Sequence, residues 1–262
     1  MTLIPCHMFS CRWSLRLEVR VAAWMLLVVC QSAGPTAPAR AELRYTLQDC
    51  LAAQTNADKL RVCPIIRGTE EEEAQGAVEA SRILRELDRY DAAVDLISRR
   101  GSHHLLDAEL GHIWFDQGDQ VTADLHFQAA LARGLVPNRQ TRERMVVAAY
   151  WQGEHLHYSN DDPAAALGGY TRALTFDPGY APALLGRGEA LQKLNRHGDA
   201  LVDLERAIGL GADWTGYLLR ARSRRARGNV AGAVADFRRV LEENPGHAGA
   251  LRALAEMADP PP

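Results

Sequence analysis

The sequence predicts an all-α protein, an α-solenoid of tandem helix-turn-helix repeats that follows a short helical N-terminal cap. Residues 170–208 carry the clearest pattern, with three helical segments separated by a turn at 177–179 and a polar break at 195–199. The third segment repeats the Ala and large apolar positions of the first. Similar segments recur about every 34 residues from residue 74 onward, a period typical of stacked helical repeats. Because no single unit can bury its apolar face alone, neighbouring units are expected to stack.

The overall composition is ordinary for a globular chain and points to no nucleic-acid partner. The 262 residues are 47% hydrophobic and 24% charged, and the formal net charge is -3. Domains that bind nucleic acid usually carry a strongly basic surface. The charge therefore gives no electrostatic reason to expect DNA or RNA binding.

Residues 1–41 have the order of features of a cleaved signal peptide. Basic side chains lie in residues 1–20, an apolar run fills residues 21–30, and a small, Pro-rich segment ends in Ala39-Arg40-Ala41. The apolar run is much shorter than the roughly 20 residues that a membrane-spanning helix needs. We therefore expect cleavage after Ala41, export of the remaining chain, and no integral membrane span once the signal is removed.

Residues 42–73 are predicted to form a helical hairpin, with helices at 47–54 and 58–66. Cys50 and Cys63 are the two cysteines that remain after the signal is removed. An even number of cysteines in an exported chain favours a disulfide. The alternative is a pair of buried free thiols. A redox-active pair is not expected, because it would need the C-x-x-C spacing.

Residues 74–257 are predicted to hold about five repeats and a C-terminal capping helix, and residues 258–262 a disordered tail. Small residues at fixed positions would let paired helices approach closely, while large apolar residues would fill the space between repeats. The best register starts the repeats at Ala74, His104, Val147, Ala181 and Asp213 or Trp214.

These residues resemble the tetratricopeptide repeat (TPR) family across residues 74–257. The family pattern places an aromatic residue, Leu-Gly, Tyr, Ala, Phe and Pro in order along about 34 residues. Matches include Leu110-Gly111, Phe127, Tyr150, Ala233 and Pro245. The resemblance implies an interaction protein whose first helix in each repeat lines a concave groove.

The spacing between the second and third repeats is longer than the others, which indicates an insertion near residues 137–144. The inserted segment, PNRQTRER, is polar and basic. A longer helix or loop is the simpler interpretation. A local contact site for an acidic partner is the alternative.

No pattern of catalytic or metal-ligating residues stands out. His155 and His157 are two residues apart, and the rings of such a pair point away from each other on a helix. His103 and His104 are adjacent and are expected to diverge as well. The chain has no H-E-x-x-H, P-loop, dinucleotide or nucleophile-elbow motif. We therefore expect no enzyme activity, no cofactor and no metal site.

The resemblance implies partner-binding residues at the groove positions of each first helix. Trp, Tyr and Arg at such positions carry much of the binding energy at interfaces. For Phe115 and Trp151, packing between repeats is an equal alternative. The predicted groove residues are His112, Phe115, Trp151, His155, Tyr158, Glu189, Arg222 and Arg225, with Leu185, Gln192 and Leu218 beside them.

Together these features predict a protein–protein interaction module or scaffold that binds a partner peptide in its groove. The resemblance to bacterial exported repeat proteins implies a periplasmic location, secretion across the inner membrane and a possible envelope complex. The alternative is a structural subunit of an envelope assembly.

Overall fold

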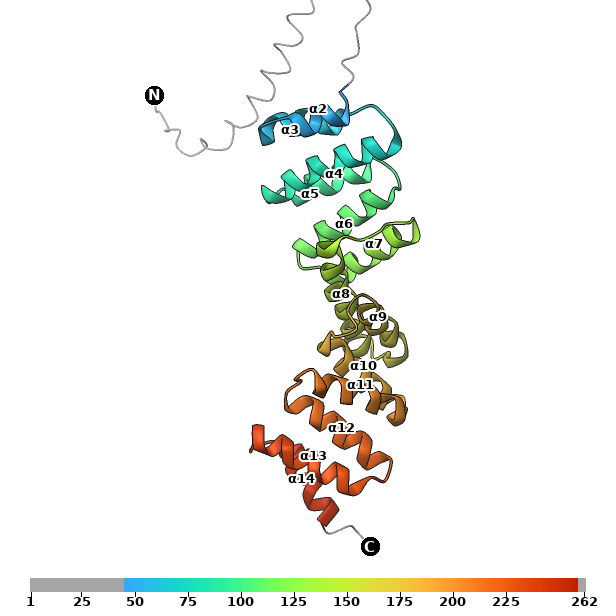
Figure 1. The fold of residues 1–262 in the computed structure, drawn as a ribbon, viewed down its shortest axis with the longest axis vertical. Coiled ribbons are helices and arrows are strands. Elements are labelled where there is room, and N and C mark those ends of the chain that lie inside the picture. Colours follow the sequence, from blue (N-terminus) through green and yellow to red (C-terminus); the bar gives the residue numbers. More distant parts are fainter. Residues whose placement is uncertain (1–44, 259–262) are drawn as a thin grey trace, which may run out of the picture. The chain divides into compact units, whose positions relative to one another are not determined.

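The computed structural model describes residues 45–258 of the chain, and all of its regular elements there are helices (Figure 1). The expected signal peptide, residues 1–41, lies outside the described residues, as does nearly all of the expected C-terminal tail. Within residues 45–258, no helix combines the length and the apolar character needed to cross a membrane.

The helices follow one another as a cap, five antiparallel pairs and a final helix. The cap consists of α2 (Leu47–Ala52), α3 (Asn56–Val62) and the short 3-10 helix η1 (Cys63–Ile65). We call the first helix of each pair the A helix and the second the B helix. The A helices are α4 (Glu70–Glu86), α6 (His104–Asp116), α8 (Arg139–Glu154), α10 (Ala181–Lys193) and α12 (Trp214–Ala226). The B helices are α5 (Tyr90–Ser98), α7 (Gln120–Ala132), α9 (Pro163–Phe176), α11 (His197–Gly209) and α13 (Val230–Glu243), and α14 (Ala248–Ala258) ends the stack.

Side-chain caps mark the starts of the A helices other than α10, which has a proline in its first turn instead. Three of them begin at His104, Ala181 and Trp214, the positions that the repeat pattern predicts. The first begins earlier than Ala74, because the Thr69 side chain and Glu72 form a capping box in front of Glu70. The acidic run that follows Thr69 therefore forms the first turn of α4.

The third A helix also begins earlier than predicted. Asn138 caps α8 by accepting a hydrogen bond from the backbone N–H of Thr141, so the helix starts at Arg139 and not at Val147. Residues 139–144 of the inserted basic segment thus form the start of a longer helix. This is the simpler of the two interpretations of the insertion.

A disulfide joins the two helices of the cap. The Cys50 and Cys63 sulfur atoms are bonded, and both residues are fully buried. They pack with Val62 and Ile66 against Ala80 of α4, so the cap covers the apolar end of the first pair. A solenoid needs such a covered end, because its terminal repeat has a neighbour on one side only.

Each buried ion pair of the fourth and fifth repeats joins an A helix to its own B helix. The Arg187 guanidinium donates two hydrogen bonds of 2.7 Å to the Asp203 carboxylate. Arg220 pairs with Asp236 in the same bidentate way, at 3.0 and 2.7 Å. Both aspartates are buried, and Asp236 also accepts a hydrogen bond of 2.8 Å from Arg224. Losing Arg187 would therefore leave Asp203 as an uncompensated buried charge, whereas Asp236 would keep a second arginine partner. These pairs hold the helices of a repeat in register.

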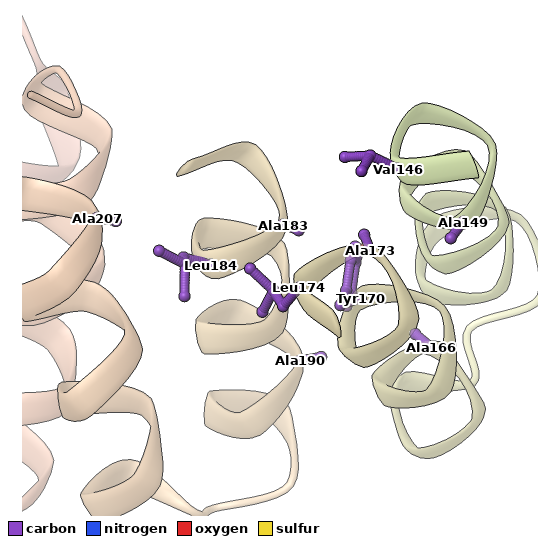
Figure 2. Packing of buried hydrophobic residues seen from close by; sticks show 10 residues of the cluster. All are labelled: Val146, Ala149, Ala166, Tyr170, Ala173, Leu174, Ala183, Leu184, Ala190 and Ala207. Atoms are coloured by element: carbon purple, nitrogen blue, oxygen red, sulfur yellow. The ribbon is translucent and has the colours of Figure 1, made fainter. Parts of the chain in front are cut away.

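The third pair of helices packs around Tyr170. Its side chain is fully buried, in the cluster of residues from α8, α9, α10 and α11 drawn in Figure 2. A Cβ on Gly153 of α8 would come within 2.7 Å of the Tyr170 ring. A Cβ on Gly169 of α9 would lie 2.5 Å from the Gly153 backbone nitrogen. The two backbones can approach this closely only because both residues lack a side chain.

We expect Gly169→Ala to destabilise the protein and the neighbouring Gly168→Ala to stabilise it slightly. A methyl group at position 169 meets backbone, which cannot move aside, whereas at position 168 the nearest atom is an Arg172 guanidinium nitrogen at 3.6 Å. The first change should cost about 1–3 kcal/mol of unfolding free energy. The second should add up to about 1 kcal/mol through helix propensity. Urea unfolding followed by circular dichroism measures both, and equal effects at the two positions would contradict this account of α8–α9 packing.

Candidate binding groove on the A helices

The A helices face one another across successive repeats. Contacts link α4 to α6, α6 to α8, α8 to α10 and α10 to α12. Among residues 45–258, no contact of similar extent joins successive B helices. The A-helix side is therefore the inner side of the stack, and side chains there lie closer together than those on the B helices.

A cavity of about 420 Å³ opens on this side, over α8, α10 and α12. We call it the central cavity. Its aromatic side chains come from α8 and the turn after it, and its glutamates from α8 and α10. The start of α12 closes it with Leu219, Thr215 and the capping Asp213. The main lining residues are Tyr150, Glu154, Tyr158, Leu185, Glu189 and Leu219.

Tyrosine hydroxyl groups hold both glutamates of the central cavity in place. The Tyr158 hydroxyl donates to Glu189 Oε2 at 2.7 Å, which joins the end of the third A helix to the fourth. The Tyr170 hydroxyl donates to Glu154 Oε1 at 2.8 Å and lies 3.3 Å from His157 Nδ1. Since that hydroxyl gives its proton to Glu154, it accepts one from His157 Nδ1. The neutral ring thus carries its proton on Nδ1.

The central cavity has a negative electrostatic character. Burial, followed by the charge of Glu154, raises the pKa of Tyr150. Burial, followed by the hydrogen bond to Glu189 and the charge of that glutamate, raises the pKa of Tyr158. Burial lowers the pKa of His157, whose side chain is fully buried. This histidine therefore stays neutral and does not compensate the glutamates.

A π-helical turn decides which residues of the third repeat face the cavity. The turn η2 (His155–Ser159) follows α8 and adds one residue before the B helix, as π-turns do. Gly153 lies against the Tyr170 ring of its B helix, and in the next repeat Gly188 lies against Leu204 in the equivalent way. When these glycines are aligned, Tyr150 corresponds to Leu185 and Glu154 to Glu189.

The predicted groove residues of the third and fourth repeats divide accordingly. Tyr158 and Glu189 line the central cavity. Trp151 and His155 are exposed and lie outside its lining. The predicted register started the third repeat at Val147, one residue too late, because it did not allow for the added residue. Tyr150 and Glu154 were not among the predicted residues. The alignment of Gly153 with Gly188 is the signal in the sequence that could have found them.

Gln192, also expected beside the groove, bridges two A helices instead of facing a cavity. Its side-chain amide donates to the Ser223 hydroxyl at 2.7 Å and to the Leu219 backbone carbonyl. Leu185, the other neighbour expected in α10, lines the central cavity. Gln192 therefore fixes α12 against α10 beside the cavity wall.

In the second repeat, the additional residues at the start of α8 cover the predicted groove residues. His112 Nε2 lies 3.1 Å from the Thr141 hydroxyl oxygen. The Arg144 guanidinium lies 5.1 Å from the Phe115 ring centroid and pairs with Asp116 at 2.7 Å. Arg144, one of the basic residues of the insertion, is thus used inside the protein.

Arg222 and Arg225 line a different, smaller cavity. This cavity has a volume of about 240 Å³ and lies between α12 and α14, with Leu218, Arg252 and Glu256. Arg225 Nη1 lies 3.1 Å from Glu256 Oε2. The inner side of the stack therefore changes from acidic to predominantly basic across α12.

His103, His104 and Glu71 lie together, contrary to the expectation that the two rings diverge. The Nε2 atoms of the histidines are 3.1 and 4.0 Å from Glu71 Oε2. However, the backbone N–H of Leu105 donates to His103 Nδ1 at 3.3 Å, which places the proton of the neutral ring on Nε2. A ligating histidine needs the opposite arrangement, with a lone pair toward the metal and a proton on the other nitrogen. The cluster fits a cap of α6 better than a metal site.

Comparison with known proteins identifies the fold. No family model matches the chain, and no curated protein matches it. Among solved structures, YrrB, described as a TPR protein with an unusual peptide-binding site, superposes with a TM-score of 0.52 at 16% identity over 70% of this chain and 92% of its own. The MamA protein gives 0.47 at 18% identity over 67% and 94%. The first TPR domain of human RPAP3 gives 0.42 at 23% identity over 44% and 90%.

The likeness to YrrB and the tandem A–B packing establish the fold as a TPR solenoid. This confirms the predicted fold class, an all-α solenoid of helix-turn-helix repeats with a helical N-terminal cap.

Replacing His112 should make the protein less sensitive to mild acid. Burial, followed by the nearby positive charges of Arg144 and Arg85, lowers the pKa of His112 to about 4. The unfolded chain, with an ordinary pKa near 6.5, binds the proton first, so stability falls as the pH drops from about 6.5 toward 4. Between pH 7.5 and 5.0 the wild type should lose about 1–2 kcal/mol more unfolding free energy than His112→Gln.

Urea unfolding at the two pH values measures this difference. Glutamine can keep the hydrogen bond to Thr141 without titrating, and His104→Gln is the matched control on the same helix. Parallel losses in the wild type and His112→Gln would show that the ring is not held neutral.

Proposed function

We propose that the protein is a non-enzymatic interaction module that binds a peptide segment of a partner protein on its A-helix side. The observation that carries the proposal is the central cavity, with Tyr150, Tyr158, Glu154 and Glu189 around an apolar floor. Its volume of about 420 Å³ is in the range of ligand sites, which run from about 300 to 1,000 Å³. Tyrosine supplies a large contact area at low entropic cost, which is why it is enriched where interfaces gain their energy.

The arrangement of the A helices supports binding of an extended segment. The central cavity spans three successive A helices, and the smaller cavity with Arg222 and Arg225 begins on the far side of α12. An occupant that follows this side of the stack would contact both. YrrB, which shares the fold, is described as having a peptide-binding site.

The peptide-binding proposal can be tested with a phage-displayed library of random linear peptides. The purified protein should select peptides, and Ala181→Trp at the rim of the cavity should weaken their binding at least about tenfold by filling the space. Ala164→Trp, an exposed position in the first turn of α9, is the matched control and should change affinity less than twofold. Fluorescence anisotropy measures both. Failure to select any peptide, or equal binding by the two variants, would contradict the proposal.

We further propose that the protein works in the cell envelope, after export to the periplasm as part of a possible envelope complex. Two observations support this location. Residues 1–41 carry the features of a signal peptide. The Cys50–Cys63 disulfide belongs to a class of bond that persists in oxidising compartments.

Export predicts a definite N-terminus and a definite redox state. When the full chain is expressed in a bacterium, the periplasmic fraction should contain protein that begins at Glu42. Its mass should be about two hydrogens below that of the dithiol, since Cys50 and Cys63 are its only cysteines. Intact mass spectrometry checks both features. An uncleaved chain in the cytoplasm with two free thiols would rule out this location.

A further inference from the structure

The two glutamates of the central cavity have no counter-charge at ion-pair distance among the described residues. Glu154 comes from the end of α8 and Glu189 from α10. Within residues 45–258, neither carboxylate has a Lys, Arg or His ion-pair partner within 4 Å. This sets them apart from the buried Asp203 and Asp236, each of which has its own arginine.

Each carboxylate also keeps unused hydrogen-bonding capacity. Tyr170 occupies Glu154 Oε1, and Tyr158 occupies Glu189 Oε2. The Tyr150 hydroxyl also hydrogen-bonds Glu154. Among the described residues, the Tyr158 hydroxyl is the one side-chain donor to Glu189. A carboxylate can accept about four hydrogen bonds, and an ammonium or guanidinium group offers three to five donors. Neither carboxylate is saturated with donors or neutralised by a contacting cation, since the nearby Lys193 ammonium pairs with Asp161. A cationic side chain would supply both further donors and positive charge.

The aromatic lining suits the same occupant. Tyr150 is held by edge-to-face packing on Tyr180, with ring centroids 5.6 Å apart. Tyr158 is half-exposed, and its ring already attracts a cation, the Lys193 ammonium, 5.5 Å from its centroid. Aromatic faces bind ammonium and guanidinium groups, most strongly where water is partly excluded. The π-turn is what carries Tyr158 to the cavity, and π-turns are frequent at functional sites.

We infer that the central cavity receives a lysine or arginine side chain of the bound peptide, with Glu154 and Glu189 as its charge partners and Tyr150 and Tyr158 against its stem. This inference rests on the proposed peptide binding and adds the chemistry of the residue recognised. The tyrosine hydroxyls keep the carboxylates in position before the ligand arrives, which lowers the cost of binding.

The test uses the peptides selected from the random library and two kinds of isosteric change. On the protein, the double substitution Glu154→Gln with Glu189→Gln removes the charges but can still accept the tyrosine hydrogen bonds. On the peptide, norleucine replaces lysine, or citrulline replaces arginine. Glu143→Gln, an exposed glutamate on α8 outside the cavity, is the matched control.

We expect the selected peptides to share one basic residue. Its neutral isostere should bind about tenfold or more weakly, as should the double glutamine variant to the basic peptide. The two changes together should cost little more than either alone, because they remove the same interaction. Glu143→Gln should bind normally.

Selected peptides that have no common basic residue, or that bind the double glutamine variant with unchanged affinity, would overturn the inference and leave the proposed peptide binding intact. Failure of the library to yield any binder would instead overturn the proposed function, and the inference with it. If the double variant were misfolded by circular dichroism, the neutral-isostere peptides on the wild-type protein would still decide the question.

Discussion

Close contact between a glycine on an A helix and a large side chain on its B helix is the constraint on which the three middle repeats of the stack depend. Gly111 lies against Phe127, Gly153 against Tyr170 and Gly188 against Leu204, each too close to accept a Cβ without movement. The large side chain reaches the opposite backbone only because that backbone carries no side chain there. Once these three pairs are locked in this way, one face of each of their A helices must turn toward the A helix of the next repeat.

The same contact explains how the candidate site arises. Because Gly153 is fixed against Tyr170, Tyr150 and Glu154 must lie on the inner side, one helical turn apart. The added residue of the π-turn then brings Tyr158 to the same side, next to Glu189. A single extra residue between the A and B helices therefore changes the chemistry of the cavity without disturbing the packing beneath it.

The carboxylates buried within the repeats are neutralised, whereas those of the central cavity are not. Inside the fourth and fifth repeats, each buried aspartate has an arginine at bidentate distance, as burial of a charge requires. Around the central cavity, the glutamates are supported by tyrosine hydroxyl groups and keep their net charge. Hydroxyl donors orient a carboxylate but do not neutralise it, so the cavity retains its attraction for a cation.

The sequence by itself determined the repeat architecture, because helix starts, turns and small-residue positions are local patterns. The starts at His104, Ala181 and Trp214 follow directly from them. It also placed Tyr158 and Glu189 on the inner side. The tertiary structure alone decided that Trp151 and His155 lie outside the cavity and that Tyr150 and Glu154 line it. The reason is that a π-turn depends on how α8 packs against α9. One added residue shifts the register of the third A helix by one position, which is about a quarter of a helical turn.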